Sequence, residues 1–319
     1  MLEIVRQSAK EFELLTAMQA GWDFNPMQLS RYEEPSQANL IRADDVGFTE
    51  FRLNVTYDQR LHARPGYYTF GILQPDCSTT WLGNQTIQSN ALIVFPREED
   101  MAAISHKGFH ANGLHFRASY LEFLVQDLYG IQLDSVLPPA GMIELPPLTH
   151  QSLRKTMQSW REMESYQDLL SPATLLDQQE ALAICVLEGM LSGSRIERTP
   201  YQKGDISFDL ALDYIHNQPV DSFTAADLCR EADCSQRWLE QCFKKRFGIT
   251  PKKYVKVLRL ARVRENLLKA DKEKRQSIIE LASEQGFWHM GQFAADYRKL
   301  YGELPSESLG RLSSSGGSI

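Results

Sequence analysis

The chain has 319 residues, of which 43% are hydrophobic, and its net charge is −7. This length suits two domains, and the apolar content is high enough to bury a core in each, which excludes an intrinsically disordered protein. The longest apolar run, residues 91–95, is far too short to span a membrane, and residues 1–20 lack the layout of a signal peptide. We therefore expect a cytoplasmic protein that does not contact the membrane.

Neither cysteine nor histidine spacing predicts a metal site or a cofactor. The five cysteines form no CxxC pair, and their odd number argues against a disulfide framework. Three of them lie in apolar periodicities of the C-terminal third, which favours small core side chains. His106, His110 and His115 lie close together in sequence, but His115 cannot share a strand face with the other two.

Charge divides the chain into two parts. Residues 206–312 carry a net charge of +3, whereas the remainder carries −10. Between Lys244 and Arg264 there are nine Lys or Arg residues and no acidic residue. Such a concentration of positive charge in an acidic protein indicates a surface that meets a polyanion.

The N-terminal part is predicted to be rich in β-strands. Residues 1–35 show no clear element. From residue 38 to 117, short runs rich in Val, Ile, Thr, Phe and Tyr are separated by turn sequences, a spacing typical of a small sandwich or a cupin-like barrel. The clearest predicted strands are 48–57, 67–73, 79–82, 90–95 and 113–116. The aromatic residues that would either line a pocket or fill the core are Trp81, Phe95, Phe109, Phe116 and Tyr120.

Helical patterns follow the strands. A first helix is predicted over residues 119–130, and the next has an apolar stripe of Leu153, Met157, Trp160 and Met163. A third helix is predicted from an N-cap at Ser171 to Gly193, with an apolar face formed by Leu175, Leu176, Leu182, Cys185, Val186 and Met190. The last two helices either close the core of a sensor domain or form a dimerisation surface.

Residues 194–205 are polar, contain Gly and Pro, and have no apolar periodicity, which predicts a linker. The predicted fold class is therefore α+β. A β-rich effector or dimerisation domain (1–193) ends in two helices, and the linker leads to an all-α domain (206–312) and a flexible tail (313–319).

The all-α domain contains two similar sets of helices. In the first set, Thr224 caps a short helix, Asp233 suits a tight turn, and Ser235 caps the next helix, which is the order of a helix-turn-helix. In the second set, a capping box over 277–280 precedes the last helix. The helix that joins them, residues 251–270, spans about 30 Å. That length would place the two reading helices close to one DNA turn apart, about 34 Å.

The predicted helix at about 235–247 has the side chains that a DNA-reading helix needs. Gln, Arg and Glu near its start can reach base edges, and Lys or Arg further along can reach phosphates. The predicted base contacts are Gln236, Arg237, Glu240 and Gln241. The predicted phosphate contacts on this helix and the joining helix are Lys244, Lys245, Arg246, Lys252, Lys256 and Arg259.

The second reading helix, at about 289–301, offers fewer polar groups. Of its outward positions only Gln292 is suited to hydrogen-bond a base, so contact with thymine methyl groups is expected from the rest. Arg298 and Lys299 are predicted phosphate contacts, and His289 is interpreted as a cap or a phosphate contact. Specificity should therefore reside mainly in the first reading helix.

Residues 207–310 resemble the DNA-binding domain of the AraC family of bacterial transcription regulators. Two patterns carry the resemblance, S-x-R-x-L-x-x-x-F-x-x-x-x-G-x-x-P-x-x-Y from Ser235 and G-F-x-x-x-x-x-F-x-x-x-Y-x-x-x-x-G-x-x-P from Gly286. The segment GFWHMGQFAADY is also similar to ethanolamine-utilisation regulators. The resemblance implies an upstream sensor or dimerisation domain, most often a role in activation, and double-stranded DNA, RNA polymerase, a small-molecule effector and a second copy of the chain as partners.

We therefore predict a sequence-specific transcription regulator that inserts both reading helices into successive major grooves under the control of its N-terminal domain, and the resemblance implies that it is an activator. One alternative is a small-molecule-binding β-barrel enzyme with an accessory DNA-binding unit, but the sequence contains no catalytic constellation. Another alternative is a non-specific architectural protein, against which the acidic N-terminal part argues.

Overall fold

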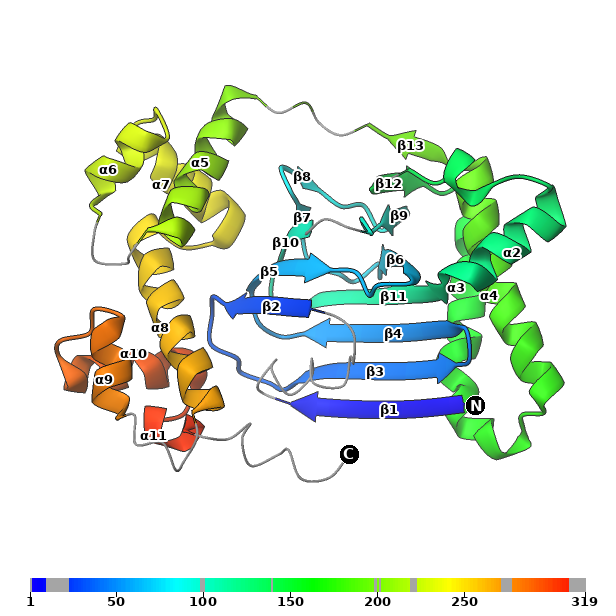
Figure 1. Ribbon diagram of the computed structural model, residues 1–319, viewed down its shortest axis with the longest axis horizontal. Coiled ribbons are helices and arrows are strands. Elements are labelled where there is room, and N and C mark those ends of the chain that lie inside the picture. The colour runs from blue at the N-terminus through cyan, green and yellow to red at the C-terminus, as the bar shows by residue number, and fades with distance from the viewer. Residues whose placement is uncertain are drawn as a thin grey trace. The chain divides into compact units, whose positions relative to one another are not determined.

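A computed structural model describes residues 2–9, 23–97, 101–138, 140–197, 200, 202–218, 223–270 and 277–309 (Figure 1). The predicted tail, 313–319, lies outside the described residues. The chain divides into two compact units. The first comprises residues 1–26, 34–54 and 59–199, and the second comprises residues 27–33, 55–58 and 200–319.

Two β-sheets form the framework of the first unit. The larger sheet has eight strands in the order β1-β3-β4-β11-β6-β9-β12-β13. Their bounds are β1 Leu2–Ala9, β3 Ser36–Ala43, β4 Val46–Leu53, β6 Tyr67–Leu73, β9 Ala91–Val94, β11 Phe109–Arg117, β12 Gly141–Glu144 and β13 Ser194–Ile196. The smaller sheet has the order β2-β5-β10-β7-β8, with bounds β2 Asp23–Gln28, β5 Tyr57–His62, β7 Thr80–Leu82, β8 Gln85–Thr86 and β10 Met101–Ser105.

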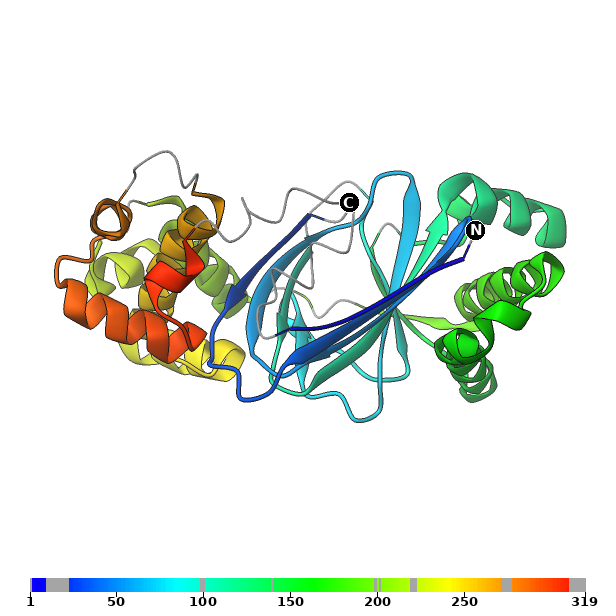
Figure 2. The same ribbon diagram turned by 90° about the horizontal axis from the view of Figure 1, so that it is seen from below.

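The larger sheet uses its two faces differently, because successive side chains on a strand point to opposite sides. One face carries Phe48, Phe70 and Phe116 into the main core. This core is completed by the helices α2 (Ala118–Tyr129), α3 (Pro147–Glu162) and α4 (Pro172–Ser192), which group together on one side of the unit (Figure 2). The other face meets the smaller sheet and encloses a cavity.

The three predicted helices of this unit are confirmed. Gly130 ends α2 in the left-handed conformation, and the Ser171 hydroxyl oxygen accepts a hydrogen bond from the Thr174 amide to begin α4. Trp160 of α3 is fully buried, and its ring centroid lies 6.1 Å from that of Phe48. The two long helices therefore close the core, while dimerisation through them stays a prediction. The prediction that Leu176 lies on the apolar face of α4 is wrong, because this side chain is 61% exposed.

Strand and linker predictions need three corrections. Residues 2–9 and 23–28 form strands where the sequence predicts none, and β1 pairs with β3 along its whole length. The predicted strand 48–57 is broken, because β4 ends at Leu53 and β5 begins at Tyr57. Residues 194–196 of the predicted linker are not a free connection but form β13, which pairs with β12 at the sheet edge. Backbone hydrogen bonds suffice for such an edge strand, without apolar periodicity.

A buried polar network joins the helix-covered face of the sheet to α3. Glu50 Oε1 lies 2.9 Å from His110 Nε2 and 3.2 Å from Arg161 Nε, and His110 Nδ1 lies 2.7 Å from Asp76 Oδ1. The hydrogen bond with His110, helped by Arg161, lowers the pKa of Glu50 to about 2 although burial opposes the shift. Asn112 Nδ2 donates to the Thr49 carbonyl at 3.1 Å, and Asn112 Oδ1 accepts from Arg161 Nη2 at 2.7 Å.

The three neighbouring histidines do not converge. His110 and His115 point to opposite faces of β11, as the parity of their positions requires. In the described part of the chain, no three His, Cys, Asp or Glu side chains are placed to hold a metal ion. All five cysteines are free thiols.

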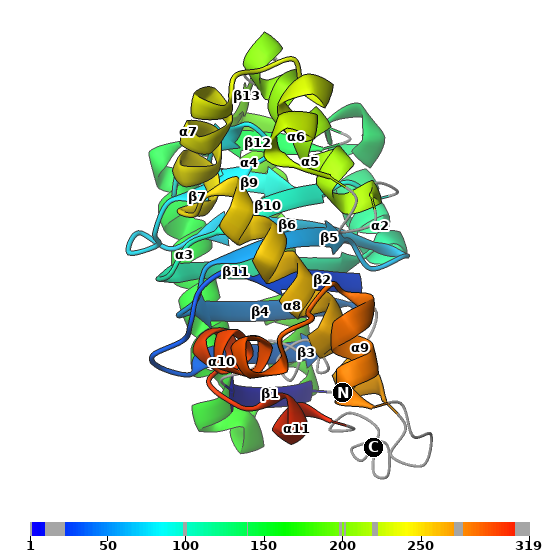
Figure 3. The same ribbon diagram turned by 90° about the vertical axis from the view of Figure 1, so that its left-hand side faces the viewer.

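The second unit is built from helices. Their bounds are α5 Lys203–Asn217, α6 Ala225–Glu231, α7 Gln236–Phe247, α8 Pro251–Lys269, α9 Ile278–Glu284, α10 Met290–Tyr301 and α11 Pro305–Ser308. The long helix α8 lies between the two helix sets, with α7 and α10 toward its opposite ends (Figure 3). The C-terminal bound of the predicted linker, residue 205, is wrong. Gln202 and Asp205 form a capping box, and α5 therefore begins at Lys203. Of the helices that the structure describes, none has the length and apolar character needed to cross a membrane.

Two arginines of the basic stretch are buried and hold the helices of the second unit together. Arg264 of α8 donates to Glu303 Oε1 at 2.7 Å, and its guanidinium lies 4.4 Å from the ring centroid of Tyr301. Arg246 of α7 donates to Asp205 Oδ1 at 2.7 Å and lies 4.3 Å from the ring centroid of Phe208. The predicted phosphate contact of Arg246 is therefore wrong, because its guanidinium is enclosed by protein groups.

Glu50 should make stability depend on acid pH. Its folded pKa of about 2 lies below the ordinary value of 4.5. The carboxylate therefore stabilises the fold above pH 4.5, and this contribution, about 3 kcal/mol, is lost as the pH falls toward 2. We expect Glu50→Gln to make the free energy of unfolding decrease less between pH 4.5 and pH 2 than in the wild type, as measured by urea denaturation. Glu188→Gln, at an exposed position of α4, should keep the wild-type slope, and an equal slope in both variants would contradict the assignment.

The Arg264 ion pair should contribute strongly to the stability of the second unit. The side chains of Arg264 and Glu303 are 4% and 13% exposed. We expect Arg264→Met to lower the free energy of unfolding by about 3 kcal/mol or more, because it leaves the Glu303 carboxylate buried without its cation. Adding Glu303→Gln should recover part of the loss. The exposed Arg298→Ala should change stability by less than about 0.5 kcal/mol in the same denaturation experiment.

Candidate nucleic-acid interface

The first helix set has the predicted helix-turn-helix geometry. Thr224 and Asp227 form a capping box at the start of α6, and Asp233 adopts a φ of 46° in the turn between α6 and α7. Aspartate tolerates this left-handed conformation better than most residues. The Ser235 hydroxyl oxygen accepts from the Trp238 amide at 3.3 Å and caps α7. The cap fixes where α7 begins, and therefore which side chains face outward.

The predicted base contacts lie together on the outer side of α7. Gln236, Arg237 and Gln241 are exposed, and Glu240 is half-buried. Gln236 Nε2 donates to Glu240 Oε1 at 3.1 Å, a contact between positions four residues apart on one helix face. The opposite side of α7 is buried through Leu239, Phe243 and Phe247. The helix thus offers a polar row of which Arg237 is the only cation in the first turn.

The second helix set repeats this arrangement. Ser277 and Glu280 form a capping box at the start of α9, and Gly286 has a φ of 75° in the turn. Gln292, Arg298 and Lys299 are exposed on α10, whereas Phe293 and Tyr297 are buried. His289 occupies the N-cap position but its side chain makes no cap hydrogen bond, so the cap interpretation is wrong. Its imidazole is exposed, as a phosphate contact would require.

The predicted phosphate contacts of α7 and α8 differ in their surroundings. Lys244, Lys245 and Lys252 are exposed, while Arg259 is half-buried. Lys256 Nζ lies 2.8 Å from Asp296 Oδ2, with the lysine side chain 47% exposed. This ion pair joins α8 to α10, and therefore Lys256 also positions the second reading helix. The sequence does not reveal the pair, because its members are 40 residues apart.

Sequence reasoning also missed Trp288. This side chain is 72% exposed and lies immediately before α10. The sequence does contain an indication of this exposure. Trp288 lies outside the apolar periodicity of Phe293, Tyr297 and Leu300, which form the buried side of α10. An exposed aromatic ring at the start of a reading helix can contact thymine methyl groups.

The comparisons with known proteins concern mainly the second unit. A helix-turn-helix domain family matches residues 228–311, which include α7, α8, α9 and α10. The probable thc operon regulatory protein of Rhodococcus erythropolis is 31% identical over 151 residues, which are 42% of this chain and 45% of that protein. XylDLEGF operon transcriptional activator 2 of Pseudomonas putida is 34% identical over 116 residues, which are 36% of this chain and 73% of that protein.

The solved structure of the AraC-like transcriptional activator CuxR is 13% identical, with a TM-score of 0.43, and the match covers 88% of this chain and 100% of that one. The chain spans less than half the length of the Rhodococcus protein. Family membership follows from the helix-turn-helix match and from the coverage of the Pseudomonas activator, and it favours regulation over the enzyme alternative. The chain belongs to the AraC family of helix-turn-helix transcription regulators.

Proposed function

We propose that the protein is a sequence-specific DNA-binding transcription activator whose activity is set by its N-terminal unit. The observation that carries this proposal is the polar row on the outer side of α7, a helix that Ser235 caps and whose other side is buried through Leu239, Phe243 and Phe247. The two relatives above are named as an operon regulator and a transcriptional activator, which supports a role in activation. The first unit, which includes most of the predicted sensor domain 1–193, would receive the signal, and the predicted domain 206–312 of the second unit would bind DNA.

Both reading helices would enter the major groove. The 19 residues of α8 give a helix of about 28 Å at about 1.5 Å per residue, comparable with the ~34 Å of one DNA turn. Bases would be read by Gln236, Arg237, Glu240, Gln241 and Gln292. Phosphates would be bound by Lys244, Lys245, Lys252, Lys256, Arg259, His289, Arg298 and Lys299. Arg237 is the strongest specificity candidate, because a guanidinium can hydrogen-bond guanine through two donors.

Double-stranded DNA is the partner that the helix-turn-helix match implies. We further propose RNA polymerase, a small-molecule effector and a second copy of the chain as partners, and a location in the cytoplasm, where the DNA is. The similarity of residues 286–297 to ethanolamine-utilisation regulators stays a prediction, and the operator sequence has to be found by selection from random DNA.

Arg237 and Lys252 should affect DNA binding in different ways. We expect Arg237→Ala to weaken binding to the selected site about tenfold or more and to leave binding to random DNA nearly unchanged, because a two-donor base contact contributes about 1–3 kcal/mol of discrimination. Lys252→Ala should weaken binding to both DNAs alike and reduce the slope of log affinity against log salt by about one. Fluorescence anisotropy with labelled duplexes at several salt concentrations measures both effects.

Lys269→Ala is a suitable control, because Lys269 is not a predicted DNA contact and pairs with Glu265 one helical turn earlier on α8. Its affinity for both DNAs should stay close to that of the wild type. If Arg237→Ala weakened binding to the selected and the random duplex equally, Arg237 would be a phosphate contact and its assignment as the reading residue would be abandoned.

A further inference from the structure

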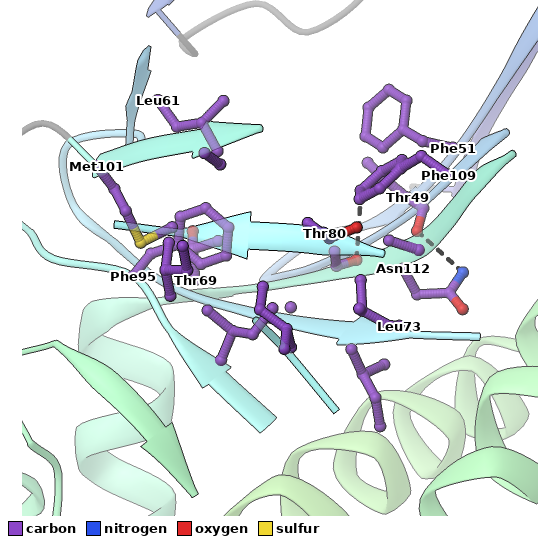
Figure 4. Close-up of a pocket in the computed structure, with 18 of the residues that line it drawn as sticks. Thr49, Phe51, Leu61, Thr69, Leu73, Thr80, Phe95, Met101, Phe109 and Asn112 are labelled. Carbon is purple, nitrogen blue, oxygen red and sulfur yellow. Dashed lines mark hydrogen bonds between the residues drawn. The ribbon is translucent and has the colours of Figure 1, made fainter. Parts of the chain in front are cut away.

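The first unit contains a cavity of about 90 Å³ between its two sheets (Figure 4). The larger sheet contributes Thr49, Thr69 and His115 to the wall, and the smaller sheet contributes Leu61, Met101 and Ala103. All of these residues belong to the first unit. The cavity is therefore a feature of this unit alone.

The part of the cavity wall that the structure describes carries no formal charge. No Lys, Arg, Asp or Glu is among the described residues that line it. Burial lowers the pKa of His115 to about 3, so its imidazole is neutral at physiological pH. A carboxylate, phosphate or ammonium group in this cavity would lose its hydration without gaining a counter-ion, which is strongly unfavourable.

Two threonine hydroxyls and His115 form a polar row on a mostly apolar wall, to which Gln59, Thr80 and Asn112 also contribute polar groups. Thr49 Oγ1 lies 3.2 Å from His115 Nε2, and Thr69 Oγ1 lies 3.3 Å from His115 Nδ1. A neutral imidazole donates from one nitrogen and accepts at the other. When Nδ1 carries the proton, Thr69 accepts from the ring and its own hydroxyl proton can be donated to another group. The row can thus present a hydrogen-bond donor to the cavity.

Gly113 makes this row possible. A Cβ atom at this position would lie 2.5 Å from Thr49 Oγ1 and 3.0 Å from His115 Nε2. No other residue type would therefore leave room for the contact between the threonine and the imidazole. The aromatic rings of Phe95 and Phe109 form part of the remaining wall (Figure 4).

The volume limits the size of an occupant. One water molecule needs about 10–15 Å³ by this kind of measure, so the cavity has room for roughly six to nine non-hydrogen atoms. We propose that it binds an uncharged, mostly apolar small molecule of this size, such as a single ring, with one oxygen that accepts a hydrogen bond from Thr69. The inference rests on the proposed function, because the molecule would be the signal that the N-terminal unit receives.

Four ring compounds of similar size test this proposal with the full-length protein. Cyclohexanone is uncharged and has one acceptor oxygen, cyclohexene has no polar group, and cyclohexylammonium and cyclohexanecarboxylate are charged. Saturation-transfer NMR detects binding, and the thermal unfolding midpoint reports stabilisation by a ligand that binds only the folded state. We expect cyclohexanone to bind and to raise the midpoint, and both ions to do neither. Binding of either ion as tight as that of cyclohexanone, or no binding of cyclohexanone, would overturn the proposal.

Two variants locate the binding. Ala103→Leu fills the cavity and should abolish cyclohexanone binding, while Thr69→Val keeps the shape of the wall and removes the hydroxyl. We expect Thr69→Val to weaken cyclohexanone binding about fivefold, the usual effect of one lost hydrogen bond, and to leave cyclohexene binding unchanged. Thr156→Val on α3, which lies outside the cavity wall, should behave as the wild type. Cyclohexanone binding of wild-type strength in Thr69→Val would overturn the role of the hydroxyl even if Ala103→Leu fails to fold.

The same experiment separates this inference from the proposed function. None of its measurements uses DNA, and none of its variants lies in the second unit. If the protein bound cyclohexanone as expected but showed no preference for any DNA sequence, only the transcription proposal would fail. If it bound a selected site through Arg237 but failed the cyclohexanone test, only the class of ligand would be wrong.

Discussion

The DNA-binding unit depends on guanidinium groups that are buried between helices. Arg264 fixes α8 against Glu303 and the ring of Tyr301, and Arg246 fixes α7 against Asp205 and the ring of Phe208. Arginine suits these positions because it stays charged, offers several donors in one plane and stacks on aromatic rings. The cost of removing the charge from water is offset by the carboxylate and by the ring. Each reading helix is therefore positioned by a contact outside its own exposed face.

In the first unit, the alternating side chains of β11 contribute to a charged network on one face of the larger sheet and to an uncharged pocket on the other. On β11, His110 faces the helix-covered side and lies between Glu50 and Asp76, whereas His115 faces the cavity and two threonines. A charged network and a neutral pocket can coexist in this way across a single sheet. The two pKa shifts have different causes, because hydrogen bonding to His110 lowers the pKa of Glu50 against the effect of burial, whereas burial itself lowers the pKa of His115.

Local signals in the sequence predicted most of the second unit. The caps Thr224, Ser235 and Ser277, and the left-handed Asp233, act within a few residues, so their roles can be read without knowledge of the fold. Partners far apart in sequence could not be predicted in this way, and Arg246 is an example, because Asp205 lies 41 residues away. In the first unit, the aromatic residues were expected either to line a pocket or to fill the core. Phe95 and Phe109 line the cavity, whereas Phe116 packs into the core on the opposite face of the sheet. Only the register of the strands decides between these faces.

The side chain of Asn112 connects a strand of the cavity wall to helix α3. This side chain is bonded at once to the carbonyl of Thr49, a residue of the cavity wall, and to Arg161 of α3. Two consecutive hydrogen bonds therefore connect β4 at the cavity to α3 across the sheet, so that the position of this helix and the shape of the cavity wall share one buried amide.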